Sequence, residues 1–151
     1  MRYMKIILVI LLNFSFSSAW AEESLINKII KKDGQYFESD AAKPFSGKIS
    51  GNKYGLYRIE TYENGQKHGL WEIYYENGKL FSKTTYNQGK ISGLKETFYS
   101  DGLPWTKTFY NNSKKTGREE YYYPNGQLMF SDIHVGDRVQ EEYYTNGQIR
   151  R

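Results

Sequence analysis

Polar and apolar residues alternate along most of the chain in short runs that end at Asn-Gly or Asp-Gly pairs. One run, residues 70–75, reads Leu-Trp-Glu-Ile-Tyr-Tyr, and a second run, residues 80–86, follows the pair Asn77-Gly78. A period of two with many aromatic residues is typical of β-strands, and Asn-Gly is a strong signal for a hairpin. The pattern therefore predicts β-hairpins, with a two-residue type I′ turn at Asn77-Gly78.

The turn pairs recur every 24 residues, with a last step of 21. A second series of glycines, Gly69, Gly93 and Gly117, keeps the step of 24, which indicates a repeat protein. A single hairpin is marginal in water, so successive hairpins are expected to pair edge to edge. The predicted fold is all-β, an elongated antiparallel sheet of successive β-hairpins. The predicted turn residues are Asn77, Gly78, Asp101, Gly102, Asn125, Gly126, Asn146 and Gly147.

A two-residue turn would also fix the register of each hairpin. In the first full unit it places Glu72 opposite Lys83 and Tyr74 opposite Phe81, so that charges and aromatic rings meet across the strands. Alternate residues of a strand face opposite sides of a sheet, so the aromatic residues separate into two ladders. The first ladder holds Tyr74, Phe98, Tyr122 and Tyr143, and the second holds Tyr75, Tyr99, Tyr123 and Tyr144.

The N-terminal segment has the layout of a secretory signal. Basic residues flank the start of an apolar run, residues 6–12, which is too short to span a membrane and leads to Ala19-Trp20-Ala21. We predict a signal peptide over residues 1–21 with cleavage at Ala19 and Ala21, and hence a periplasmic or secreted protein. Residues 22–46 are expected to form an N-terminal cap and leading hairpin, either strand or short amphipathic helix at their start, and residues 47–151 the repeat array.

Composition narrows the classes of function. The 151-residue chain has no cysteine, which excludes disulfide scaffolds, thiol catalysis and cysteine-ligated metals. Its formal charge of +4 includes Arg2 and Lys5, so residues 22–151 carry only +2. So small a charge does not favour a nucleic-acid partner.

The sequence offers few candidates for a catalytic or ligand-binding site. The two histidines are His68 and His134, and we expect both at solvated or packing positions, because neither has a His or carboxylate partner at the spacing of a zinc site. The sequence has no Gly-x-Ser-x-Gly elbow and no phosphate-binding glycine motif, and its repeated glutamates fit cross-strand pairing. We therefore expect no enzyme activity, no catalytic residues, no metal or cofactor and no small-molecule substrate.

Three glycine-led runs carry a resemblance to a known family. Residues 69–78, 93–102 and 117–126 resemble the bacterial variant of the MORN (membrane occupation and recognition nexus) repeat. Residues 43–48, Lys-Pro-Phe-Ser-Gly-Lys, are similar to the leading segment of YwqK-like antitoxin proteins. The resemblance implies protein binding, membrane association or toxin neutralisation. Ser113 replaces a turn glycine, and export is unexpected for an antitoxin that meets a cytosolic toxin.

Two functional hypotheses follow. The first is an exported repeat scaffold that binds another protein, such as a toxin or an envelope component, through its aromatic and charged ladders. The second is a module that associates with phospholipid or glycan at the envelope surface, with Lys83, Lys107, Lys114 and Lys115 as contacts. The candidate partner-binding residues are Trp71, Tyr75, Tyr99, Trp105, Tyr123 and Tyr144.

Overall fold

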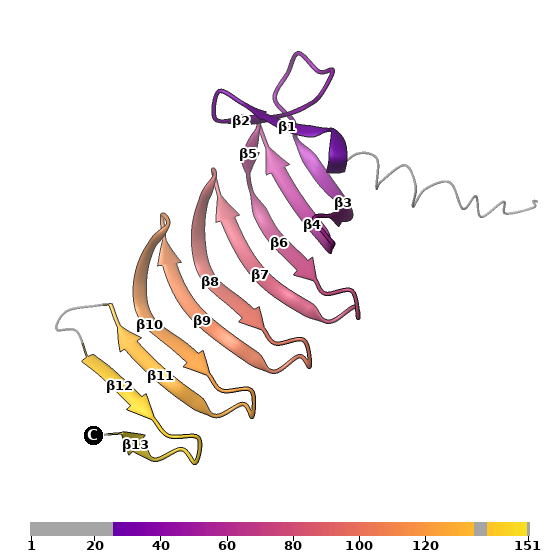
Figure 1. The fold of residues 1–151 in the computed structure, drawn as a ribbon. Coiled ribbons are helices and arrows are strands. Elements are labelled where there is room, and N and C mark those ends of the chain that lie inside the picture. The colour runs from indigo at the N-terminus through magenta and orange to yellow at the C-terminus, as the bar shows by residue number, and fades with distance from the viewer. Residues whose placement is uncertain (1–25, 135–138, 151) are drawn as a thin grey trace, which may run out of the picture.

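The computed structural model describes residues 26–134 and 139–150 of the chain. These residues form a two-stranded and an 11-stranded sheet, both antiparallel, whose strands follow one another in chain order (Figure 1). The predicted all-β array of successive hairpins is confirmed. The predicted signal peptide, with Ala19 and Ala21, lies outside the described residues. Within the described ranges, no helix has the length and apolar character needed to cross a membrane.

The large sheet has the strand order β13-β12-β11-β10-β9-β8-β7-β6-β4-β3, with β5 paired to β4. Residues 26–28 form a helical turn that leads directly into β1. The strands are β1 (Ile29–Lys32), β2 (Gln35–Glu38), β3 (Gly47–Lys53), β4 (Leu56–Glu63), β5 (Gln66–Lys67), β6 (Gly69–Tyr74), β7 (Leu80–Asn87), β8 (Lys90–Phe98), β9 (Pro104–Asn111), β10 (Lys114–Tyr122), β11 (Leu128–Ile133), β12 (Val139–Tyr143) and β13 (Ile149–Arg150).

The register in the middle of the hairpins is the predicted one, because Glu72 lies opposite Lys83 and Glu96 opposite Lys107. Nearer the turn the prediction is wrong. Tyr74 lies opposite Leu80, and a bulge at Phe81 restores the register. The second and third hairpins shift in the same way near their turns.

The turn at Asn77-Gly78 explains the shift. It is a three-residue loop, in which the Tyr75 N–H donates to the Lys79 carbonyl oxygen at 2.9 Å. Gly78 has φ 78°, as expected for the glycine that ends such a loop. The Asn77 Oδ1 accepts a hydrogen bond from the Lys79 N–H at 3.0 Å, which is why a short amide or carboxylate side chain suits this position.

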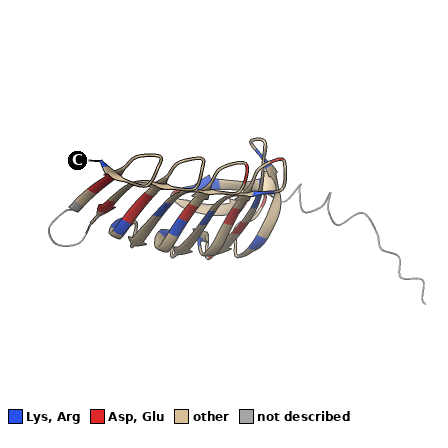
Figure 2. Ribbon diagram, turned by 90° about the horizontal axis from the view of Figure 1, so that it is seen from below, with Lys and Arg blue, Asp and Glu red and all other residues tan. Residues whose placement is uncertain are grey.

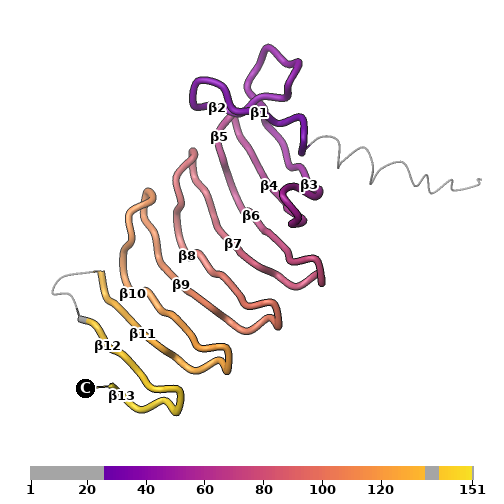
Figure 3. Tube along the Cα trace, viewed as in Figure 1, coloured from indigo at the N-terminus to yellow at the C-terminus, as the bar shows by residue number. Residues whose placement is uncertain are grey.

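Two-residue turns join β1 to β2, β3 to β4, β4 to β5, β7 to β8 and β9 to β10. Both central residues have positive φ there, as a type I′ turn requires. These pairs are Asp33-Gly34, Tyr54-Gly55, Asn64-Gly65, Gln88-Gly89 and Asn112-Ser113. Beyond the Gln88-Gly89 and Asn112-Ser113 turns the strand bulges, so that residues 92–94 face Thr85 alone and residues 116–118 face Phe109 alone. The hairpins consequently share one curvature, which the Cα trace shows (Figure 3).

The hydrophobic core lies at the N-terminal end of the large sheet. The N-terminal hairpin and the segment after it pack on one face, which we call the cap face; the opposite face is the open face. On the cap face, the Tyr62 ring lies 4.8 Å from Tyr36, 5.7 Å from Phe45 and 5.1 Å from Trp71, between centroids. The buried apolar residues of the described chain are Ile26, Ile29, Ile49, Tyr62 and Trp71.

Backbone hydrogen bonds fix this N-terminal cap to the sheet. The Tyr36 N–H donates to the Gly65 carbonyl, the Gly65 N–H to Phe45, and the Phe45 N–H to Tyr36, each at 2.8 Å. Gly65 is buried, and a Cβ there would lie 2.8 Å from the Pro44 Cβ. The β4–β5 turn is therefore the docking point of the cap.

Candidate binding surfaces

A row of alternating charges crosses the open face. Glu72, Lys83, Glu96, Lys107 and Glu120 lie directly opposite one another on β6 to β10. Figure 2 shows acidic and basic positions on adjoining strands of the sheet. Each lysine of the row thus has a glutamate on both sides, and the row carries no excess of positive charge.

Tyrosine hydroxyl groups on the same face donate hydrogen bonds to the glutamates two residues before them. The Tyr122 hydroxyl donates to the Glu120 carboxylate at 2.7 Å, and Tyr143 donates to Glu141 at the same distance. Burial and this hydrogen bond raise the pKa of Tyr122 to about 12. The three tyrosines of the first predicted ladder therefore use their hydroxyl groups within Glu-x-Tyr pairs, and the fourth member, Phe98, has no hydroxyl group.

Large apolar side chains form a second row on the open face, nearer the two-residue turns. Leu70 and Phe109 are 39% and 48% exposed, and the half-buried Leu94 pairs directly with Phe109. These residues were not among the predicted partner-binding set. Leu70 and Leu94 each follow a glycine of the 24-residue series, which is the sequence signal that could have identified this row.

The second predicted ladder joins neighbouring repeats. The Tyr75 hydroxyl donates to the Phe98 carbonyl and the Tyr99 hydroxyl to the Tyr122 carbonyl, both at 2.7 Å. Tyr123 makes the same bond to the Tyr143 carbonyl at 3.0 Å. These three predicted binding residues are half-buried and tie each hairpin to the next.

The other predicted binding residues lie in different environments. Trp71 is only 7% exposed, because the cap covers it and its Nε1 donates to the Thr61 carbonyl at 2.8 Å, so it belongs to the core. Trp105 is 41% exposed and its ring lies 5.9 Å from that of Tyr99. Tyr144 is half exposed, with the Arg150 guanidinium 5.8 Å from its ring centroid. The structure does not bring the six residues together on one surface.

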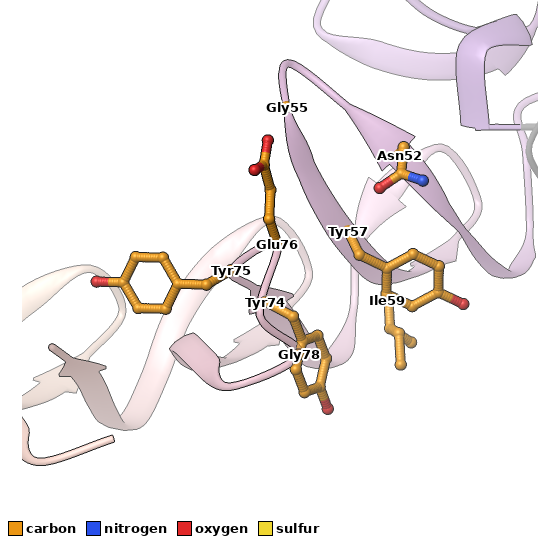
Figure 4. Close-up of a pocket in the computed structure, with 8 residues that line it drawn as sticks. All are labelled: Asn52, Gly55, Tyr57, Ile59, Tyr74, Tyr75, Glu76 and Gly78. Atoms are coloured by element: carbon orange, nitrogen blue, oxygen red, sulfur yellow. The ribbon is translucent and has the colours of Figure 1, made fainter. Parts of the chain in front are cut away.

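A cleft of about 390 Å³ opens between the β3–β4 turn and the β6–β7 loop (Figure 4). The rings of Tyr57 and Tyr74 lie beside it, with centroids 6.2 Å apart, while Tyr75 points away toward the next repeat. Glu76 contributes a carboxylate to its lining. Apolar walls with one charged group at the edge suit a single side chain of a protein partner.

Each histidine lies beside a carboxylate. His134 Nε2 lies 2.9 Å from the Glu119 carboxylate, and His68 Nδ1 lies 3.3 Å from Glu63. His134 occupies the repeat position of a tyrosine, and Glu119 occupies a position that holds Trp71 and Lys95 in the two preceding repeats, so two residues without a counterpart in the other repeats meet on the cap face. That coincidence was the available sequence signal.

Glu119 is the centre of a compact polar cluster. Its buried carboxylate also accepts hydrogen bonds from Lys115 and from the Tyr121 hydroxyl, the latter at 3.0 Å. Burial alone would raise the pKa of Glu119, but the bonds from Lys115, His134 and Tyr121 outweigh it and hold the pKa below 4.5. Asp132 approaches His134 at 3.7 Å. Within the described residues, no group of three His, Asp or Glu side chains is arranged to hold a metal ion.

Comparison with known proteins identifies the repeat. Residues 67–88, which include the β6–β7 hairpin, and residues 115–131, which include most of β10 and β11, match the MORN repeat variant family. No curated protein sequence matches the chain. The chain therefore contains MORN-variant repeats, which suggest a scaffold for binding, and similarity to YwqK-like antitoxin proteins stays a prediction.

Proposed function

We propose that the protein is an exported scaffold that binds another protein through the open face of its sheet. The observation that carries the proposal is the exposed apolar row that contains Leu70 and Phe109, which runs beside the row of alternating charges. Apolar anchors next to polar groups of both signs are typical of protein interfaces. The MORN-variant repeats in this chain support a role as a binding scaffold in general, without indicating which partner is bound.

The charge pattern favours a protein over an anionic envelope surface. Lys83 lies between Glu72 and Glu96, so its charge is compensated on the sheet itself. Lys115, another of the predicted contacts, bonds to Glu119. Binding to anionic lipid needs a cluster of uncompensated basic residues. The ladders do not provide one, so binding of phospholipid or glycan through the ladders is the weaker hypothesis.

The proposed binding is tested by capture from envelope and secreted fractions with paired variants. Leu70→Asp with Phe109→Asp places charges in the apolar row, whereas Ile30→Asp with Leu103→Asp changes two residues of matched exposure outside it. A partner that is retained by the native chain and the control, and lost by the first variant, supports the proposal. Equal capture by both variants, or no partner at all, contradicts it.

Toxin neutralisation would be one form of this function. The support is the resemblance of residues 43–48 to the leading segment of YwqK-like antitoxin proteins. With export, the target would be a toxin that acts in the envelope. Co-expression with the product of any adjacent toxin gene tests this: survival that depends on Leu70 and Phe109 supports it, and survival without them contradicts it.

Export needs its own measurement. Cleavage after Ala21 would leave Glu22 at the N-terminus of the protein recovered outside the cytoplasm. Mass spectrometry of the intact protein shows whether this occurs. An uncleaved chain confined to the cytoplasm would contradict the proposed location while leaving the binding experiment valid.

A further inference from the structure

Two adjoining clefts lie where the N-terminal cap meets the cap face. Their volumes are about 300 and 280 Å³, and Lys31, Tyr36 and Lys67 line both. Among the described residues that line either cleft, Glu60 is the one carboxylate. The cationic lining residues are Lys31, Lys53, Arg58, Lys67 and Lys90. We call this the basic cleft; its charge excess equals the formal net charge of the entire chain, +4.

The single carboxylate is already occupied. Glu60 is 4% exposed, accepts a hydrogen bond from the Tyr62 hydroxyl at 2.7 Å and lies 3.5 Å from an Arg58 nitrogen. No ion pair joins the four lysines of the basic cleft to a described carboxylate. Lys67 instead lies over the Trp71 ring, 4.3 Å from its centroid. The positive charge of the basic cleft is therefore largely uncompensated.

The repeat itself provides an internal comparison. Lys115 occupies the same repeat position as Lys67, two repeats later, but bonds to Glu119, where the first repeat has Trp71. The hydrogen bond to Glu119 raises the pKa of Lys115. Burial, together with the nearby cations Lys31 and Arg58, lowers the pKa of Lys67 in spite of Glu60. An anion beside Lys67 would supply the partner that Lys115 already has.

We propose that the basic cleft binds a small organic polyanion, with phosphate or carboxylate groups against its lysines and Arg58. Two joined compartments that both have cationic linings suit a ligand with more than one anionic group. Arg58 also lines the larger cleft, and a guanidinium group suits phosphate and carboxylate ligands. The Tyr36 and Trp71 rings provide an apolar wall for the carbon framework of the ligand. This site is separate from the open face and does not depend on the proposed protein partner.

Isothermal titration calorimetry of the full chain at low salt tests the proposal, with pyrophosphate and citrate as probes. Lys31→Gln with Lys67→Gln removes two charges from the basic cleft, and Lys83→Gln with Lys107→Gln removes two from the open face. We expect the first variant to weaken binding roughly tenfold or more and the control to bind as the native chain. Glu60→Gln keeps an acceptor for Tyr62 and removes the opposing charge, so it should bind more tightly.

A fluorescence titration localises the binding. The chain has three tryptophans, and replacing Trp20 and Trp105 with Phe leaves only Trp71, under Lys67. A change in Trp71 emission that saturates with the calorimetric signal supports the site. Equal losses in both lysine variants would overturn it, because binding would then be general attraction. No binding of either probe would also overturn it.

Vesicles distinguish a soluble ligand from a lipid headgroup with the same chemistry. Vesicles of phosphatidylcholine with and without phosphatidylglycerol are sedimented with the native chain and both lysine variants. Pyrophosphate binding that needs Lys31 and Lys67, without sedimentation, supports a soluble polyanion. Sedimentation with anionic vesicles, in the absence of pyrophosphate and citrate binding, overturns the small-ligand site.

Discussion

Replacing Gly65 with alanine should detach the N-terminal cap more than it disturbs the repeat array. Gly65 sits in the β4–β5 turn at φ 72°, in the left-handed region. Its backbone N–H and carbonyl bond to Phe45 and Tyr36 of the cap. An added Cβ would lie 2.8 Å from the Pro44 Cβ and 3.0 Å from the Gln35 Cβ, closer than such atoms approach.

Two terms set the size of the effect. A left-handed conformation costs a residue with a Cβ about 1–2 kcal/mol. Insertion of a methyl group into a filled site costs a further ~1–3 kcal/mol through shifted neighbours. Gly89 occupies the same position one repeat later, at φ 79°, but a Cβ there meets no atom within 4 Å. Gly89→Ala should therefore lose only the first of these two contributions to the free energy of unfolding. Gly65→Ala should be more destabilised than Gly89→Ala by about 1–3 kcal/mol.

Urea unfolding followed by circular dichroism measures the free energy of unfolding for both variants. Hydrogen exchange adds a local measurement, because the amides of Tyr36 and Phe45 bond within the docking point. Their exchange should accelerate in Gly65→Ala and stay unchanged in Gly89→Ala. Equal destabilisation of the two variants, with slow exchange at Tyr36 in both, would refute the reasoning that Gly65 docks the cap.

Three further variants test the contacts within and between repeats. Tyr99→Phe removes the hydroxyl bonded to the Tyr122 carbonyl and should lower the free energy of unfolding by about 0.5–1.5 kcal/mol, whereas Tyr54→Phe, at an 84% exposed residue, should change it by less. Asp101→Asn should stabilise the chain by up to ~1 kcal/mol in urea unfolding, because Asn77 uses its amide to bond across to the next repeat and an aspartate cannot donate. Glu119→Gln should destabilise the chain by about 1–3 kcal/mol at pH 7. Since the folded pKa of Glu119 is lowered, its ionised form stabilises the fold above pH 4.5 and this contribution is lost as pH falls through the folded pKa. The difference between native and Glu119→Gln should therefore shrink on acidification, and a constant difference would contradict the assignment.

Local patterns predicted the hairpins and their central register because both depend on neighbouring residues. Glu72 and Lys83 are joined by one short loop, so the period of two and the turn signal suffice to pair them. The turn type was wrong because Asn-Gly serves both a two-residue type I′ turn and a three-residue loop ending in glycine. The choice depends on Asn77, whose side chain caps the Lys79 N–H and also reaches the Ser100 carbonyl of the next repeat.

Contacts between distant segments were beyond local patterns. Trp71 was predicted to bind a partner, but it is buried beside Tyr62, which packs against Tyr36 of the cap. The basic cleft is assembled from the cap, from β3 to β5 and from the start of β8, and no sequence window contains more than a few of its cations. Its charge therefore left no run of basic residues in the sequence.

The repeat separates structural from functional residues by a physical argument. Side chains that recur every 24 residues, such as Tyr75 and Tyr99, have the same bond to satisfy in each unit, so the stacking of repeats accounts for them. Residues that do not recur with this period are not explained by the stacking of repeats, so they need a local partner or a ligand. At one repeat position of the cap face, successive repeats have Trp71, Lys95 and Glu119, and Glu119 pairs with the lysine four residues before it. The unpaired case, Lys67, lies in the basic cleft, which is why a ligand is expected there and not beside Lys115.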